Sequence, residues 1–199
     1  MDADKTFYPR LFKYPFDVHF RHFSRYFNVI KLIDTLGRGE RWLDCACGSG
    51  YGTHLLSEFC DEITGFDIDI ETIAYARKRY ETDNCIFVSE QSEIMPKHYD
   101  CIISIETIEH VSRNEAGELL QLMKNWLKET GVLAITTPIV PTSNPNPSNP
   151  YHLYEYDMEE FCDLLKQSGF HIEHIETERV TFTDNETKDQ AMFRCKVRK

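Results

Sequence analysis

The chain has 199 residues, 41% of them hydrophobic and 28% charged, a balance that predicts one globular domain over residues 1–199. No apolar run approaches the roughly 20 residues that cross a bilayer, and the charged, aromatic N-terminus lacks the apolar stretch of a signal peptide. The formal charge of −11 repels phosphate backbones, which weighs against a nucleic-acid partner without excluding one. Seven scattered cysteines without metal or disulfide spacing indicate reduced thiols and a cytoplasmic location.

Strand and helix patterns alternate in the first half of the chain, which is typical of a largely parallel sheet covered by helices. Aromatic and aliphatic residues at helical spacing predict a first helix that ends near Gly37. The pattern then predicts strands over 41–45, 62–66 and 85–89 and helices over 54–59 and 70–80.

The second half continues the alternation and ends with two strands. It predicts a strand over 99–104, a strand over 131–137 and a helix that ends at Gly169. Between the two strands it predicts a helix whose one face carries Leu119, Leu120, Met123, Trp126 and Leu127. The proline-rich segment 138–150 should be irregular, because proline fixes φ and removes a donor. Strand patterns over 170–178 and 190–197 flank a polar turn and predict a closing antiparallel hairpin. The expected fold is an α/β three-layer sandwich.

The segment WLDCACGSGYGT, residues 42–53, carries the strongest signal for ligand binding. Glycines directly after a strand let the backbone approach a ligand closely and aim N–H groups at it. The glycines stand at 48, 50 and 52, which departs from the G-x-G-x-x-G spacing of nicotinamide sites. The Asp44 carboxylate would repel a pyrophosphate but attract a cation. The segment therefore favours a cationic cofactor over a dinucleotide, and disfavours a nicotinamide oxidoreductase.

An acidic residue, Asp67, ends the next predicted strand, where it can accept hydrogen bonds from both ribose hydroxyls of a nucleoside. Together these residues resemble the class I S-adenosylmethionine-dependent methyltransferases, which carry D-x-x-C-G-x-G and then a strand ending in G-x-D. Asp44 to Gly50 matches the first motif, and Gly65 to Asp67 matches the second. The resemblance runs from about residue 19 to 196 and implies a Rossmann-like, seven-stranded, mostly parallel sheet.

The resemblance also implies a cofactor, S-adenosyl-L-methionine, and residues that bind it. Gly48 and Gly50 would pack under the methionine part and Asp67 would hold the ribose. At the adenine, where the family often has an aspartate and a small residue, this chain has Gln91 and Ser92, a departure that puts this pair in doubt. Flanking positions implied to line the cofactor are Cys45, Ser49, Tyr51, Ile68 and Ile105.

Arg25 lies in HFSRY, a pattern that in some relatives belongs to a helix covering the cofactor. Residues 1–36 would then form an N-terminal arm and covering helix, and Arg25 could pair with the methionine carboxylate. The alternative is a solvated arginine on an amphipathic helix. For Cys45 and Cys47, a buried thiol beside a tight turn is the default interpretation.

Two carboxylates and two histidines form a second constellation. Glu106, Glu109 and His110 follow the fourth predicted strand, and His152 follows the proline-rich segment. Such groups suit a divalent cation, Mg or similar. They resemble the sets in the ubiquinone-biosynthesis O-methyltransferases and the small-RNA 3′-terminal ribose methyltransferases. Three interpretations stay open: a metal site, a metal-free site in which His110 is the base and Glu106 braces the cofactor loop, and a structural role.

The expected function is O-methylation of a small hydroxylated acceptor such as a sugar, a quinol or a phenol, because a hydroxyl must lose a proton that a histidine or metal can take. Residues 138–156 would form the acceptor-side loop, with tyrosines either stacking on the acceptor or packing the loop. The alternatives are RNA 3′-terminal ribose 2′-O-methylation, which needs a basic track, and a non-catalytic cofactor-binding partner subunit. The sequence leaves the oligomeric state open.

Overall fold

The computed structural model describes residues 20–33, 40–145, 149–181 and 187–198. The chain divides into two compact units, Met1–Ile94 and Met95–Lys199, called the first and second units below. The predicted N-terminal arm up to residue 18, and the expected helix end at Gly37, lie outside the described residues. None of the helices in the described ranges has the length and apolar character to cross a membrane.

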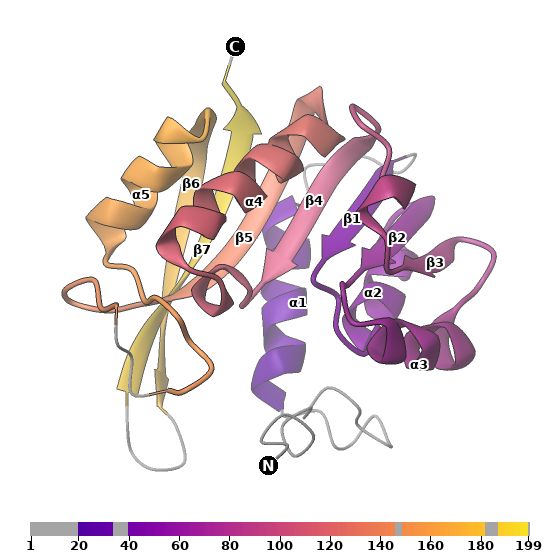
Figure 1. Cartoon of the computed structure of the whole chain (residues 1–199), viewed down its shortest axis with the longest axis horizontal. Helices are drawn as coiled ribbons and strands as arrows, with labels where there is room; N and C mark the ends of the chain where they lie inside the picture. Colours follow the sequence, from indigo (N-terminus) through magenta and orange to yellow (C-terminus); the bar gives the residue numbers. More distant parts are fainter. Residues whose placement is uncertain (1–19, 34–39, 146–148, 182–186, 199) are drawn as a thin grey trace. The chain divides into compact units, whose positions relative to one another are not determined.

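The first unit alternates strands and helices as expected (Figure 1). Its elements are α1 (Phe20–Ile33), β1 (Arg41–Cys45), α2 (Tyr51–Leu56), the 3₁₀ turn η2 (Ser57–Phe59), β2 (Glu62–Phe66), α3 (Ile70–Tyr80), β3 (Cys85–Val88) and the 3₁₀ turn η3 (Gln91–Glu93). The strands run parallel in the order β3-β2-β1. In this register Asp44 lies opposite Gly65, which brings the ends of β1 and β2 together.

The helix that follows β2 has a capping residue at its N-terminus and a buried apolar face. Asp69 accepts a hydrogen bond from the backbone N–H of Thr72 at 2.9 Å, which satisfies a free donor of the first turn of α3. Ile73 and Ala76 of this helix are buried, and α3 packs against β3. The short connection from β2 to α3 therefore holds Asp67 in a fixed position.

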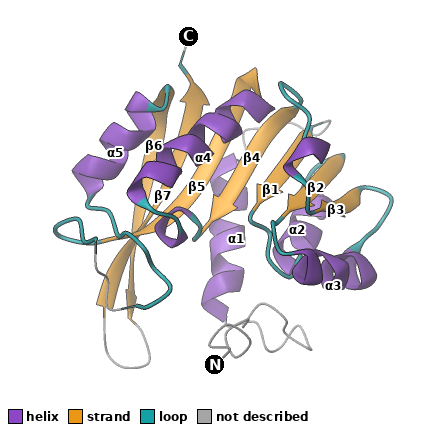
Figure 2. Ribbon diagram, in the orientation of Figure 1, coloured by secondary structure: helices purple, strands orange, loops and turns teal. Residues whose placement is uncertain are grey.

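The second unit carries the antiparallel hairpin that the sequence predicts. Its elements are β4 (Tyr99–Ile105), the 3₁₀ turn η4 (Ile108–His110), α4 (Arg113–Trp126), β5 (Leu127–Ile139), α5 (Met158–Gln167), β6 (Phe170–Thr181) and β7 (Thr187–Val197). The order is β4-β5-β7-β6, with β4 and β5 parallel and the other pairs antiparallel. Helices α4 and α5 cover the same face of these strands (Figure 2).

The structure corrects two boundaries in this unit. Leu127, expected on a helix face, is the first residue of β5, and β5 continues through Pro138, which was expected to be irregular. Pairing between β4 and β5 ends at Thr136, so Pro138 has β7 as its only strand neighbour in the described pairing, at Gln190. Proline is tolerated at such an edge because its missing donor interrupts no second ladder.

Strand order and direction within the two units match the predicted seven-stranded, mostly parallel sheet with a C-terminal antiparallel hairpin, so the fold class is confirmed. Large side chains fill the core of the second unit: the rings of Phe161 and Phe193 meet at 4.9 Å between centroids, and Tyr156 and Phe161 at 5.3 Å. Full burial of an apolar side chain contributes about 1.5–3 kcal/mol.

Candidate functional site

The loop between β1 and α2 has a backbone that only a glycine-rich segment adopts easily. Ala46, Gly48 and Gly50 have φ of 63°, 54° and 83°, all in the left-handed region. A Cβ at position 50 would lie 2.7 Å from the Cβ of Ala76 and 2.7 Å from Cε1 of Phe87. Position 50 therefore requires glycine for its φ and for the space that it leaves.

Asp44 lies at the base of this loop with 1% of its surface exposed. Its Oδ2 accepts a hydrogen bond from the Thr53 hydroxyl at 2.7 Å. Burial raises the pKa of the Asp44 carboxyl from 3.8 to about 7; the Thr53 bond opposes that rise and the charge of Asp67 adds to it. A buried acid of this kind gains charge stabilisation when a cation binds nearby.

Asp67 follows β2 and braces the glycine loop. Its two carboxylate oxygens accept the backbone N–H groups of Gly48 at 2.9 Å and of Asp69 at 3.0 Å, and 4% of its surface is exposed. A Cβ on Gly65 would approach Phe87 to 2.6 Å, which explains the glycine of the G-x-D motif. Each carboxylate oxygen keeps a second lone pair, so bracing the loop and accepting a hydroxyl are compatible.

Helix α1 brings Arg25 and Tyr26 to the same loop. The Tyr26 and Tyr51 rings meet edge-on at 5.6 Å, and a Cβ on Gly52 would collide with the Tyr26 ring. Burial raises the pKa of both phenols and the charge of Asp44 raises it further, whereas the charge of Arg25 lowers it. Arg25 is 9% exposed, so it is a buried neighbour of Tyr51 and not a solvated arginine.

The remaining residues predicted for the cofactor differ in exposure. Cys45 and Ser49 are buried, and burial raises the pKa of the Cys45 and Cys47 thiols, as expected of inert thiols. Ile68 is 82% exposed directly after Asp67. Gln91 and Ser92 are exposed on η3, after β3, while Ile105 ends β4 in the second unit and is half-buried.

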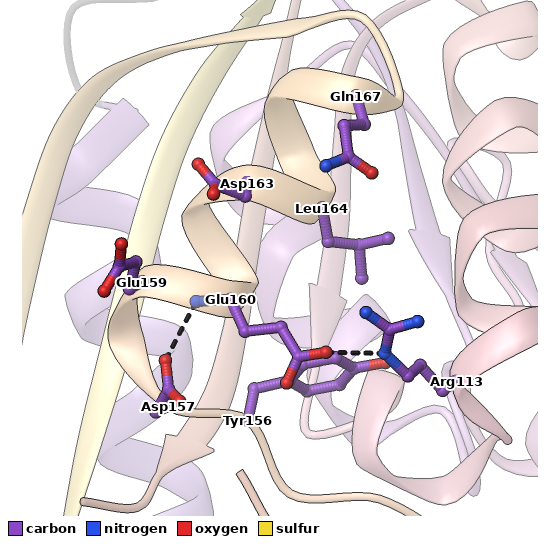
Figure 3. A pocket seen from close by; sticks show the side chains of 8 residues that line it. All are labelled: Arg113, Tyr156, Asp157, Glu159, Glu160, Asp163, Leu164 and Gln167. Carbon is purple, nitrogen blue, oxygen red and sulfur yellow. Dashed lines mark hydrogen bonds and ion pairs between the residues drawn. The ribbon is translucent and has the colours of Figure 1, made fainter. Parts of the chain in front are cut away.

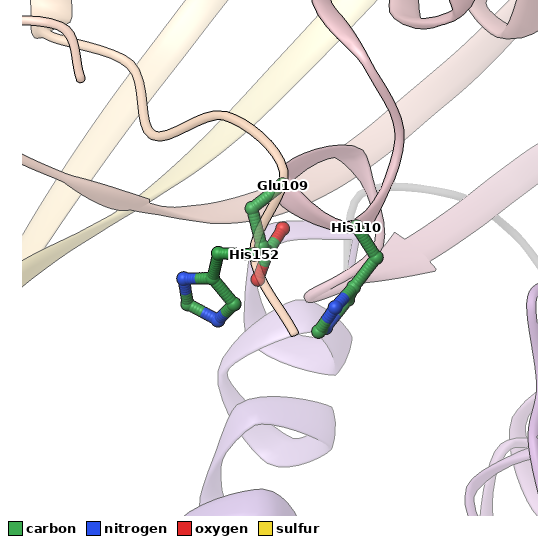
Figure 4. A group of neighbouring side chains, drawn as sticks. All are labelled: Glu109, His110 and His152. Atoms are coloured by element: carbon green, nitrogen blue, oxygen red, sulfur yellow. The ribbon is translucent and has the colours of Figure 1, made fainter. Parts of the chain in front are cut away.

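Glu109, His110 and His152 gather in the second unit, each offering a ligand atom within 4.8 Å of the others (Figure 4). Glu109 is buried and its Oε2 accepts the Thr137 hydroxyl at 3.3 Å. The Glu109 carbonyl also accepts the backbone N–H of Leu153 at 2.7 Å, which ties the loop that carries His152 to η4.

The hydrogen bonds of the two histidines fix the nitrogen on which each carries a proton. Nδ1 of His110 lies 2.8 Å from the Tyr151 carbonyl oxygen, which can only accept, so this Nδ1 is the donor. Nδ1 of His152 lies 2.6 Å from Oε1 of Glu155. A neutral imidazole whose Nδ1 donates carries its lone pair on Nε2, the nitrogen that can take a proton or bind a metal.

Glu106 is not a member of this group. Its Oε1 accepts the Thr136 hydroxyl at 2.9 Å, and its backbone N–H reaches the same residue. Its φ of 52° is in the left-handed region, which a non-glycine residue rarely adopts. The structure thus brings together three of the four predicted metal ligands, while the carboxylate of the fourth, Glu106, is bound by Thr136 of β5.

A hollow of about 420 Å³ lies beside α5, and two of its acidic residues, Asp157 and Glu160, are already engaged (Figure 3). Glu160 pairs with Arg113 at 2.5 Å and accepts the Tyr154 hydroxyl at 2.8 Å. Asp157 caps α5 through the backbone N–H of Glu160. Tyr154 and the fully buried Tyr156 therefore pack the segment, whereas Tyr151 is 39% exposed.

A family model described as "Methyltransferase domain" matches residues 19–175. The chain belongs to this methyltransferase family. The resemblance to class I S-adenosylmethionine-dependent methyltransferases, carried by Asp44, Gly48, Gly50 and Asp67, is thereby confirmed. Sequence reasoning found these four, but it missed Thr53, Tyr26 and Glu155. Thr53 is the third residue of a helix, Tyr26 is an aromatic residue within a helix and Glu155 lies in a loop, and none of these positions forms a distinctive spacing with other residues.

Three known proteins that this chain is similar to show how far the likeness extends. A probable S-adenosylmethionine-dependent methyltransferase of Mycolicibacterium smegmatis is 28% identical over 139 residues, covering 68% of this chain and 53% of the relative. A ubiquinone biosynthesis O-methyltransferase of Actinobacillus pleuropneumoniae is 28% identical over 109 residues, 50% of this chain and 46% of the relative. The chain thus spans about half the length of these curated relatives.

The third is a solved structure, the 1,6-didemethyltoxoflavin-N1-methyltransferase of Burkholderia thailandensis with its substrate and S-adenosylhomocysteine bound. It is 20% identical, with a TM-score of 0.70, and the match covers 85% of this chain and 76% of that one. At this identity the likeness concerns the fold. One of these proteins is named for an oxygen acceptor and another for a nitrogen acceptor, so these likenesses do not decide the acceptor of this chain.

Proposed function

We propose that this methyltransferase transfers a methyl group from S-adenosylmethionine to a hydroxyl oxygen of a small acceptor. The observation that carries the cofactor assignment is the buried Asp44 carboxyl beside a glycine loop braced by Asp67. When bound, the cofactor supplies a sulfonium methyl group that needs no further activation. The protein therefore has to bind the cofactor, orient the acceptor and remove the hydroxyl proton.

The first unit fits the cofactor in charge and in shape. The acidic Asp44 would face its cationic part, and the free lone pairs of Asp67 would accept ribose hydroxyls. Arg25, buried next to Tyr51, offers a cation for the methionine carboxylate. Because no Cβ stands at positions 48 and 50, a ligand can approach the backbone of the left-handed loop closely.

We also propose that Glu109, His110 and His152 hold a divalent cation. Two imidazoles and one carboxylate favour Mn, Fe or Zn over Mg, which prefers oxygen ligands. A cation there would lower the pKa of a coordinated hydroxyl. In a metal-free enzyme the same geometry leaves Nε2 of His110 to accept the hydroxyl proton. Both routes serve an oxygen acceptor, and an amine acceptor needs neither.

Calorimetric titration with S-adenosylhomocysteine tests the cofactor assignment. We expect wild type to bind, and Asp67→Asn and Asp67→Ala to bind at least tenfold more weakly. Asp67→Asn keeps the shape of the side chain, so it still tests the assignment if Asp67→Ala unfolds because it no longer braces the loop. Asp83→Asn is the matched control, because Asp83 is an exposed acid of the same unit. Failure of the wild type to bind would contradict the proposal.

A methyl-transfer assay against phenols, quinols, sugars and amines tests the acceptor class. We expect activity on a hydroxylated compound, a loss of about 10²–10⁴-fold in His110→Ala, and a response to added Mn²⁺ or Zn²⁺ if the cation is required. Transfer to amines alone would refute the assignment to oxygen. Activity that survives in His110→Ala would remove this cluster from the reaction.

A further inference from the structure

The two histidines of the cluster differ in what holds them. Nδ1 of His110 donates to a backbone carbonyl, whereas Nδ1 of His152 meets the carboxylate of Glu155 at 2.6 Å. We propose that Glu155 is a positioning residue that holds His152 with its Nε2 free to bind the cation. This inference rests on the proposed metal site of Glu109, His110 and His152 and assigns that site a fourth residue that touches no metal.

Glu155 is held in place by backbone hydrogen bonds and by burial of its side chain. Its N–H and carbonyl form two hydrogen bonds with the backbone of Asn144, at 3.0 and 2.8 Å. Its side chain is 3% exposed and that of His152 is 11% exposed. A buried carboxylate is costly unless it is paired, and Oε1 of Glu155 lies 2.6 Å from Nδ1 of His152. The carboxylate therefore meets the His152 ring from a fixed position.

His152 depends on such a partner more than His110 does. His110 belongs to η4, whereas His152 lies in a segment outside the helices and strands. Secondary structure therefore leaves the orientation of the His152 ring open. A carboxylate that accepts from Nδ1 fixes the tautomer and makes Nε2 the binding atom. The loop can thus supply a directed ligand without regular backbone structure.

Two purely local readouts test this role, each on the full chain. Nitrogen NMR of the histidines reports the tautomer without any metal, and titration with Co²⁺ alone, followed by its visible absorption, reports imidazole ligation. We expect His152 to carry its proton on Nδ1 in wild type. In Glu155→Ala that preference should be lost and Co²⁺ affinity should fall by about 10–100-fold. Glu155→Gln keeps an acceptor oxygen, so it should keep the tautomer and lose less affinity.

The controls separate this role from a general effect on folding. Glu159→Gln removes an exposed acid close by in sequence and should leave both readouts unchanged. His152→Ala should lose at least as much affinity as Glu155→Ala. Unchanged tautomer and affinity in Glu155→Ala would overturn the inference while leaving the metal site in place. A wild type that binds no Co²⁺ would overturn the metal site and the inference together, and S-adenosylhomocysteine binding would still test the cofactor assignment independently.

Discussion

Replacing Asp44 by asparagine should make the protein more stable at high pH, even though it removes a residue of the proposed cofactor site. Asp44 is 1% exposed and its carboxyl has a pKa of about 7 in the folded chain. In the unfolded chain an aspartate ionises near 3.9. The folded state therefore binds more protons than the unfolded state between these values, and stability falls as the pH rises through that window.

The magnitude follows from the difference between the two pKa values. One pKa unit corresponds to about 1.4 kcal/mol, so the full difference amounts to about 4 kcal/mol, of which about 3 kcal/mol falls between pH 5 and pH 9. Asparagine keeps an acceptor oxygen for the Thr53 hydroxyl but has no charge to bury. The free energy of unfolding of Asp44→Asn, relative to wild type, should therefore increase by about 3 kcal/mol from pH 5 to pH 9.

Urea unfolding at several pH values measures this quantity directly, because the midpoint and slope give the free energy of unfolding. Asp83→Asn makes the same chemical change at an exposed position and should show no comparable pH-dependent gain. If the difference between Asp44→Asn and wild type stays constant from pH 5 to pH 9, then Asp44 is not a buried carboxyl with a raised pKa. The electrostatic argument for a cation next to it would then fail.

Three further predictions concern the same loop. Affinity for S-adenosylmethionine should rise from pH 6 to pH 8 in wild type and not in Asp44→Asn, because a bound cation favours the ionised form of Asp44. Calorimetry in buffers of different ionisation enthalpy should detect the proton that Asp44 releases on binding. Thr53→Val should cost about 1.5–3 kcal/mol at pH 9 by urea unfolding, and less at pH 5, where Asp44 is neutral. Gly50→Ala should lower the free energy of unfolding, measured by thermal denaturation, by more than about 2 kcal/mol, because position 50 has a left-handed φ and the new Cβ would meet Phe87. Gly117→Ala, at a helical position with open space around it, should be neutral or stabilising.

The sequence predicts this loop well because its chemistry constrains consecutive residues. A strand, a left-handed turn and a close helix leave few options at positions 48 and 50, and an acid at the end of each of two neighbouring parallel strands must arrive at the same edge. Thr53 and Tyr26 are not constrained in that way. Thr53 contacts the Asp44 carboxyl and Tyr26 packs over Gly52, and such tertiary contacts leave no periodic trace in the chain.

In the second unit the sequence predicts the arrangement of the candidate site less well. Spacing alone placed Glu106, Glu109 and His110 together, yet a left-handed residue at Glu106 directs its carboxylate to Thr136 and away from the other two. Residue spacing assumes a regular backbone, and that assumption fails where β4 ends. His152 joins the cluster because the Glu109 carbonyl holds Leu153, a backbone bond that no side-chain pattern encodes. The part of the site that depends on loops therefore has to be tested by changing the residues that hold those loops. Removing the Glu155 carboxylate tests whether the His152 ring is oriented by a hydrogen bond or only lies near the cluster.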